Sequence, residues 1–185
     1  GRSTRWATAI VDPPVVITAK GRAMRIEALN ERGAVLLPVV RACLERLSDI
    51  TIESADARVI AVRVHEPAGV TAEEDRSRVP TVFTPLRAIV DLFRTDEDGN
   101  LGLYGAFGYD LAFQFDPVEL HRERPDDQRD LVLYLPDEIL VVDHHQACAW
   151  HDRYDYSGKG FSTEGLARGG EQRPFKASDK IPPRG

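Results

Sequence analysis

Two stretches of the chain repeat apolar residues every three or four positions, which is the spacing of one face of an α-helix. The first stretch has its apolar positions at Leu36, Val40, Cys43, Leu44 and Leu47. The second has them at Phe83, Leu86, Ile89, Val90 and Phe93. Thr84 before Pro85, or the earlier Thr81, supplies the N-terminal cap of the second stretch. The pattern predicts two amphipathic helices.

Shorter stretches are rich in β-branched residues or alternate apolar with polar positions, which is typical of strands. They cover residues 5–12, 15–20, 23–30, 58–64, 130–135, 137–143 and 147–156. Pro13 and Pro14 predict a corner between the first two strands, Pro136 separates two others, and residues 30–33 predict a turn that returns the chain. Strands outnumber helices and do not alternate strictly with them, so we predict an α+β fold, mainly antiparallel, with two or three packed helices.

The segment LGLYGAFGYDLAFQFDPVEL, residues 101–120, spaces three glycines as a phosphate-binding loop does. Such a loop needs a following helix and usually a Lys, Ser or Thr, and this segment contains none of the three. Large side chains mostly occupy its odd positions and small ones its even positions, which suits a strand that another backbone approaches closely. A helical turn fits after Tyr109, with Asp110 as its cap and Leu111 above Phe115. We therefore interpret the glycines, Gly105 among them, as packing residues.

Composition and charge narrow the class of protein. Hydrophobic residues make up 42% of the 185 positions and charged residues 29%, which is ordinary for a globular chain. A net charge of −6 argues against a nucleic-acid or anionic-membrane surface. No apolar run reaches the ~18–20 residues of a membrane span. The two cysteines, Cys43 and Cys148, are expected to be buried, reduced thiols in a cytoplasmic protein.

The last part of the chain changes in composition. From Ser157 onward, glycines and prolines interrupt a polar segment with six Lys or Arg against three acidic residues. This pattern is typical of a linker, so we expect a domain at residues 1–156, a linker at residues 157–185 and a longer parent chain.

Several polar groups in the sequence are candidate sites. His144 and His145 are adjacent, and adjacent residues on a strand point to opposite faces, which makes a poor metal site. Together with the nearby His151, Asp143 and Asp152, they are better explained as solvated polar residues at strand ends. Asp137 and Glu138 fit turn residues better than an acid pair. Residues 126–127 and 96–98 are surface charge runs. Ser157, Ser162 and Ser178 have no neighbouring base, so no catalytic, effector or metal residue is assigned.

LYGAFGYDLAFQFDPVEL resembles the Gly-x-x-Gly-Tyr-x-x-Tyr-Asp signature of chorismate-utilising enzymes. TVFTPLRAIVDLFR, QRDLVLYLPDEILVVDH and PFKASDKIPPRG resemble anthranilate synthase component I, in particular the long bacterial form fused to its glutamine amidotransferase. The resemblance runs over nearly the whole chain in one register. The opening GRSTRWATAIVDPP is similar to the family's Gly-Arg-Tyr-Ser-Arg stretch, although Ser3 replaces its Tyr.

The resemblance implies the N-terminal, regulatory domain of a larger two-layer β-sandwich enzyme that converts chorismate and glutamine into anthranilate, pyruvate and glutamate. It implies that the chorismate pocket and the Mg²⁺ ligands belong to a C-terminal domain after residue 185, so no cofactor is expected in this chain. The implied partners are that domain, the amidotransferase, L-tryptophan as effector and further copies of the enzyme. A sister enzyme such as aminodeoxychorismate synthase, or a stand-alone ligand-binding module, is the alternative.

Overall fold

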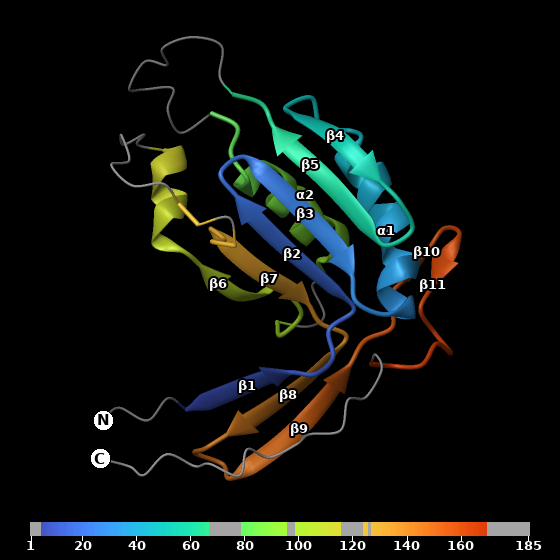
Figure 1. Ribbon diagram of the computed structural model, residues 1–185. Coiled ribbons are helices and arrows are strands. Elements are labelled where there is room, and N and C mark those ends of the chain that lie inside the picture. The colour runs from blue at the N-terminus through green and yellow to red at the C-terminus, as the bar shows by residue number, and fades with distance from the viewer. Residues whose placement is uncertain (1–4, 67–78, 96–98, 116–123, 126, 170–185) are drawn as a thin grey trace, which may run out of the picture.

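The computed structural model describes residues 5–66, 79–95, 99–115, 124–125 and 127–169. They form a mixed α and β structure in which neighbouring strands are antiparallel, as predicted (Figure 1). No helix in the described part is long and apolar enough to cross a membrane. Residues 67–78, the acidic run at residues 96–98 and the end of the predicted linker at residues 170–185 lie outside the described residues.

The larger sheet has six strands in the order β4-β5-β3-β2-β7-β6. Their bounds are Ile50–Ala55, Val59–Val64, Ala23–Ala28, Val15–Lys20, Leu131–Leu135 and Tyr104–Phe107. The strands that were predicted at residues 15–20, 23–30, 58–64 and 130–135 are all present, with small differences at their ends. Strand β4 was missed, because its apolar residues Ile50 and Ile52 are followed by the polar Glu53 and Ser54.

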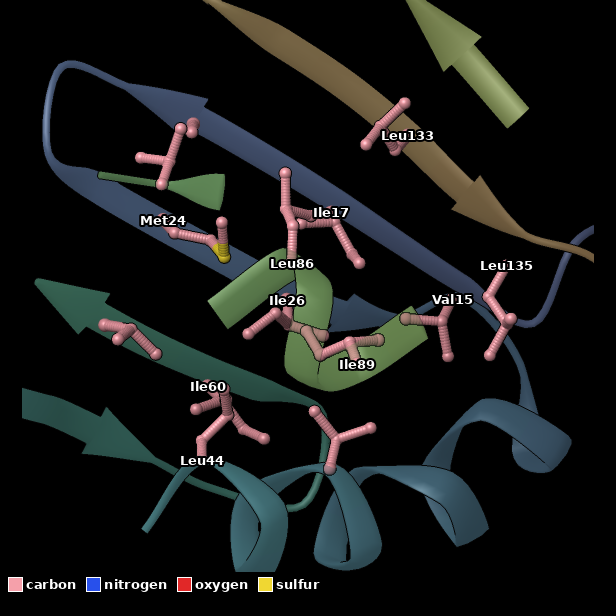
Figure 2. Close-up of a cluster of buried hydrophobic side chains, with 14 of the residues drawn as sticks. Val15, Ile17, Met24, Ile26, Leu44, Ile60, Leu86, Ile89, Leu133 and Leu135 are labelled. Carbon is pink, nitrogen blue, oxygen red and sulfur yellow. The ribbon is translucent and has the colours of Figure 1, made fainter. Parts of the chain in front are cut away.

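Helices α1 (Glu31–Leu44) and α2 (Phe83–Phe93) cover one face of this sheet. Every second residue of the central strands points toward them, beginning with Val15, Ile17 and Ala19 on β2, and each of these is at most 4% exposed. Figure 2 shows Leu86 and Ile89 of α2 beside Val15 and Ile17 of β2, and Leu44 of α1 beside Ile60 of β5. The alternation follows from the two-residue period of a strand and places the hydrophobic core between the sheet and the two helices.

A second sheet has three strands, β1 (Trp6–Ile10), β8 (Glu138–Asp143) and β9 (Cys148–Arg153), in the order β1-β8-β9. The chain passes from one sheet to the other at the predicted corners, Pro13-Pro14 between β1 and β2, and Pro136 between β7 and β8. In Figure 1 the small sheet lies at one end of the large sheet. Two connections therefore join the small sheet to that end of the large sheet.

The short hairpin of β10 (Ser157–Gly158) and β11 (Phe161–Ser162) falls in the predicted linker. It is followed by Thr163, which is fully buried and whose N–H donates to the carbonyl of Tyr156 at 2.9 Å. Residues 157–169 thus continue the folded structure and contact helix α1 through β11.

Residues 30–33 are not a separate turn, and this prediction was wrong. Asn30 is the N-cap of α1, and its side-chain oxygen accepts from the N–H of Gly33 at 3.0 Å. An Asn before a run of apolar residues is a helix start signal, and it outweighed the turn tendency of the same residues. At the start of α2 neither predicted cap is present, because Val82 occupies the cap position and makes no side-chain capping bond. The hydroxyl of Thr81, one residue earlier, accepts from the N–H of Phe83 at 3.3 Å.

The packing role of the glycines is confirmed at Gly105. A Cβ atom there would lie 2.0 Å from the carbonyl oxygen of Val132 in the adjacent strand β7. A 3₁₀ helix, Tyr109–Gln114, follows β6, so the helical turn is also present. Asp110 is not its cap: Gly108 occupies the cap position, while the Asp110 carboxylate accepts from the Gln128 side chain at 2.6 Å.

Candidate functional site

The largest fully buried side chain among the described residues is Arg32, in the first turn of α1, with 1% of its surface exposed. Its Nε donates to Oδ2 of Asp137, on the connection from β7 to β8. Its two terminal nitrogens donate to the carbonyl of Thr163 at 2.6 Å and to the carbonyl of Tyr154 at 2.8 Å. A further bond of 2.8 Å reaches Oδ1 of Asp155. The guanidinium group of Arg32 therefore links the start of α1 to three later parts of the chain, at Asp137, at residues 154–155 and at Thr163.

Arg168 adds a second cation to the same group. It donates to the carbonyl of Asp137 at 2.8 Å, to the carbonyl of Tyr154 at 2.9 Å and to Oδ1 of Asp155 at 2.9 Å. Arg32, Asp137, Asp155 and Arg168 are called the Arg32 network below. Two guanidinium groups and two carboxylates balance each other, which is the condition under which charges are tolerated inside a protein.

The electrostatics of the Arg32 network differ between its two acids. Burial raises the pKa of Asp137 above its ordinary value, while the hydrogen bond and charge of Arg32 and the charge of Arg168 oppose that shift. The hydrogen bond from Arg32 lowers the pKa of the more exposed Asp155. Oδ1 of Asp137 is buried and accepts from no group among the described residues. Both guanidinium groups are occupied by protein acceptors, so the arrangement holds sheets together and offers no open catalytic group.

This result corrects the prediction for Asp137 and Glu138. They do flank the break at Pro136, but they are not exposed turn residues: Asp137 is 0% exposed, and Glu138 lies in β8, where Arg153 contacts its carboxylate at 3.0 Å. No pattern in the sequence signalled the role of Arg32. An arginine among the polar residues at the start of a helix is expected to be exposed to solvent. Its burial depends on the tertiary structure.

The histidine group does not form a metal site. His144 and His145 lie in the turn after β8 and not on a strand, whereas His151 lies on β9. Asp143 is fully buried and not solvated as predicted: its carboxylate pairs with Arg5 at 3.0 Å and accepts from the N–H of His145 at 2.8 Å. Within the described ranges, no three His, Cys, Asp or Glu side chains are arranged to hold a metal ion.

The remaining candidates are dispersed. Ser157 and Ser162 are exposed in the hairpin β10–β11, and Ser162 accepts from the N–H of Glu164. Asp127 is exposed, while Asp126, residues 96–98 and Ser178 lie outside the described residues. Asp152 accepts from the side chains of Asn100 and Trp150. None of these described groups is brought next to a partner that would activate it.

The thiols differ from the prediction. Cys148 is exposed at the start of β9, and Cys43 is only partly buried on α1, where burial raises its pKa. The two residues lie on different elements and are not bonded to each other.

An open recess of about 580 Å³ lies beside the end of α2, next to the Arg32 network. Arg94, Arg153 and Asp155 line its polar side, and Phe93 and Phe161 line its apolar side. Arg153 is already paired with Glu138, and Arg94 also has an interaction partner. The charged groups of the recess are therefore engaged within the chain.

No protein-family model matches the chain. Curated proteins do: the anthranilate synthase of Azospirillum brasilense is 49% identical over 177 residues, which are 95% of this chain and 24% of that protein. Anthranilate synthase component 1 of Serratia marcescens is 30% identical over 153 residues, which cover 76% of this chain and 27% of that protein. The corresponding protein of Salmonella typhimurium is 29% identical over 141 residues.

The matches extend over most of the chain, and the chain spans only about a quarter of the length of these curated relatives. The resemblance that rested on the signature segment and its neighbours is confirmed. The chain is a homologue of the anthranilate synthases across about a quarter of their length.

Proposed function

We propose that this chain is the N-terminal, regulatory part of an anthranilate synthase and that the parent protein makes anthranilate and pyruvate from chorismate with ammonia from glutamine. The observation that carries the proposal is the 49% identity over 95% of the chain to a protein named anthranilate synthase. All of the significant relatives carry that name, which supports this reaction over that of a sister chorismate enzyme.

The catalytic chemistry is assigned to residues outside this chain. The buried charged side chains Arg32, Asp137 and Asp143 are used in the Arg32 network and in the Arg5–Asp143 pair. Among the described residues no three His, Cys, Asp or Glu side chains are arranged to hold a metal ion. We assign the Mg²⁺ ligands and the chorismate pocket to the C-terminal part of the parent protein.

The role of this part is regulatory and structural under the same proposal. Two sheets joined by two corners and one buried ion network form a unit that can shift as a whole against a neighbouring domain when an effector binds.

L-Tryptophan is the proposed effector, and its pocket is shared between this part and segments outside residues 1–185. We propose a glutamine amidotransferase as the ammonia source, a homo-oligomeric assembly and a cytoplasmic location. We propose that the amidotransferase is in the same chain, because the Azospirillum protein is longer than the Serratia protein. The 177 matched residues are 24% of the Azospirillum protein, and the 153 matched residues are 27% of the Serratia protein.

The test is the product of the purified parent protein. With chorismate, glutamine and Mg²⁺, it is expected to release fluorescent anthranilate together with pyruvate, and L-tryptophan is expected to inhibit that release. Formation of a non-aromatic amino derivative of chorismate without pyruvate would assign the chain to the sister enzyme instead. Binding of chorismate without any turnover would favour the ligand-binding module.

A further inference from the structure

The two edges of the six-stranded sheet are built differently. At one edge, β4 carries a bulge between Ile52 and Ser54, and its Glu53 pairs with Arg63 of β5. Bulges and charges are the devices by which proteins protect an edge strand from pairing with another strand. At the other edge, β6 pairs regularly with β7 from Tyr104 to Phe107, and residues 101–109 contain no charged side chain. Among the described residues, a bulge and a charged side chain protect the β4 edge, and the β6 edge has neither.

Aromatic side chains surround this unprotected edge. Phe107 is 56% exposed, Tyr109 85% and Phe115 45%. The ring of Phe83, at the start of α2, lies 5.8 Å from the ring of Phe107 and 5.9 Å from that of Phe115 between centroids. These four residues are called the aromatic face. Phe83, Phe107 and Phe115 form one cluster, while the ring of Tyr109 lies 6.2 Å from that of Phe113. Clustered exposed apolar groups mark an interaction site.

The segment that carries much of the aromatic face is turned with its polar residues inward. The side chain of Gln114 accepts from the N–H of Val82 at 3.1 Å and donates to the carbonyl of Gly21 at 2.8 Å. The carboxylate of Asp110 accepts from Gln128 at 2.6 Å and pairs with Arg124 at 3.2 Å. These bonds fix the 3₁₀ helix in an orientation that keeps Tyr109 and Phe115 at the surface. In Figure 1 this helix follows β6 at the end of the large sheet.

The area of the aromatic face indicates what covers it. Its three exposed rings offer on the order of 400 Å² to a partner. An interface between separate chains buries about 800 Å² on each partner, so this face alone is too small for a stable dimer. A partner within the same polypeptide needs less area, because its effective concentration is high. The relatives have about three quarters of their length outside the part that matches this chain.

We propose that a strand from the part of the parent protein outside residues 1–185 pairs with the outer edge of β6 and packs apolar side chains on the aromatic face. This inference rests on the proposed function only in assuming that the parent protein is as long as its relatives. Addition of a strand supplies backbone hydrogen bonds along β6, and pockets between the rings select the apolar side chains. The signature segment then acts as the contact between the two parts of the enzyme.

A photo-crosslinking experiment on the full parent protein tests this contact. Phe107→p-benzoylphenylalanine keeps an aromatic ring at the site, and Ser54→p-benzoylphenylalanine on the protected edge β4 is the matched control. Protein from a mixture of ¹⁴N-labelled and ¹⁵N-labelled chains is irradiated, and mass spectrometry identifies the joined peptides and separates links within one molecule from links between two.

We expect at least fivefold more crosslinking from position 107 than from position 54, within one molecule and to peptides outside residues 1–185. Links between residues 1–185 of two molecules, links confined to residues 1–185 of one molecule, links to another polypeptide, or a yield no higher than that of the control would each overturn the inference. The same samples are assayed for anthranilate before irradiation. A parent protein that crosslinks as expected but makes no anthranilate would refute the proposed function and leave the contact supported.

Discussion

Arg32 and Asp137 form an ion pair that is closed off from solvent, with both side chains about 1% exposed, although they are 105 residues apart in the chain. Asp137 lies on the connection from the large sheet to the small sheet, and Arg32 lies in the helix that covers the large sheet. The pair therefore fixes the small sheet relative to the hydrophobic core.

Arg32→Ala is expected to destabilise the chain strongly. The substitution leaves the carboxylate of Asp137 buried without its main partner, a change that typically costs about 3–5 kcal/mol. The matched control is Arg41→Ala, which removes the exposed pair with Glu45 at 2.8 Å and should cost at most about 0.5 kcal/mol. Urea unfolding monitored by circular dichroism measures both.

The double variant Arg32→Met with Asp137→Leu separates a charge effect from a packing effect. Removing both charges should recover part of the stability that Arg32→Ala loses, because no uncompensated charge remains in the interior. A loss for Arg32→Ala that is no larger than the loss for Arg41→Ala would show that the buried pair does not hold the sheets together.

Acid should weaken the small sheet through Asp143. Burial opposes ionisation of this carboxyl, but the Arg5 side chain and the N–H groups of Gln146 and His145 lower its pKa below the ordinary value. A folded-state pKa below the unfolded value of about 3.9 means that the carboxylate stabilises the fold above that pH. The contribution is lost as the pH falls through the folded-state pKa.

Thermal unfolding between pH 6 and pH 2 tests this effect. Asp143→Asn should lower the melting temperature at pH 6 and should make stability depend less on pH in the acid range. Asp127→Asn, at an exposed position, is the control and should leave the profile unchanged. Coincident acid profiles for wild type and Asp143→Asn would contradict the assignment.

Gly105 should tolerate no side chain. A Cβ atom there meets the Val132 carbonyl oxygen at 2.0 Å and the Leu133 Cα at 2.9 Å, so Gly105→Ala must move the strand β7. Overpacking of this kind costs about 1–3 kcal/mol or more. Gly102→Ala is the control, since no atom lies within 4 Å of a Cβ at that position.

Substitution of Gly105 in the parent protein separates packing from ligand binding. Gly105→Val is expected to lower the melting temperature and the soluble yield and to leave the KM for chorismate near that of wild type in the protein that folds. A variant that melts like wild type and fails to bind chorismate would show that the glycines form a ligand loop.

The sequence predicted the parts of the fold that depend on local pattern. The apolar stripe at Leu36, Val40 and Leu44 predicts a helix, because one face of the helix must be buried. The break at Pro136 predicts two separate strands, because proline interrupts strand pairing. Strand β4 was not predictable in this way, because an edge strand with Glu53 on it lacks continuous alternation.

The sequence could not predict the buried charges or the outward-facing rings. Arg32, Asp137 and Asp143 are polar residues whose burial depends on partners more than 100 positions away. Phe107 and Phe115 are large apolar residues, which are expected to be buried in a core. The hydrogen bonds of Gln114 and Asp110 instead hold that segment with its aromatic rings at the surface. Such positions depend on tertiary contacts that a local pattern does not contain.

We propose that this chain regulates and supports a reaction whose catalytic groups lie elsewhere in the parent protein. The most direct measurement compares the 185-residue chain, shown to be folded by a cooperative thermal transition, with the parent protein at equal concentration. Anthranilate fluorescence is followed with chorismate, Mg²⁺ and either glutamine or ammonia. We predict steady anthranilate formation by the parent protein and none above a no-protein control by the 185-residue chain. Anthranilate formation by the folded chain alone would contradict the account, because it would place the catalytic residues within these 185 positions.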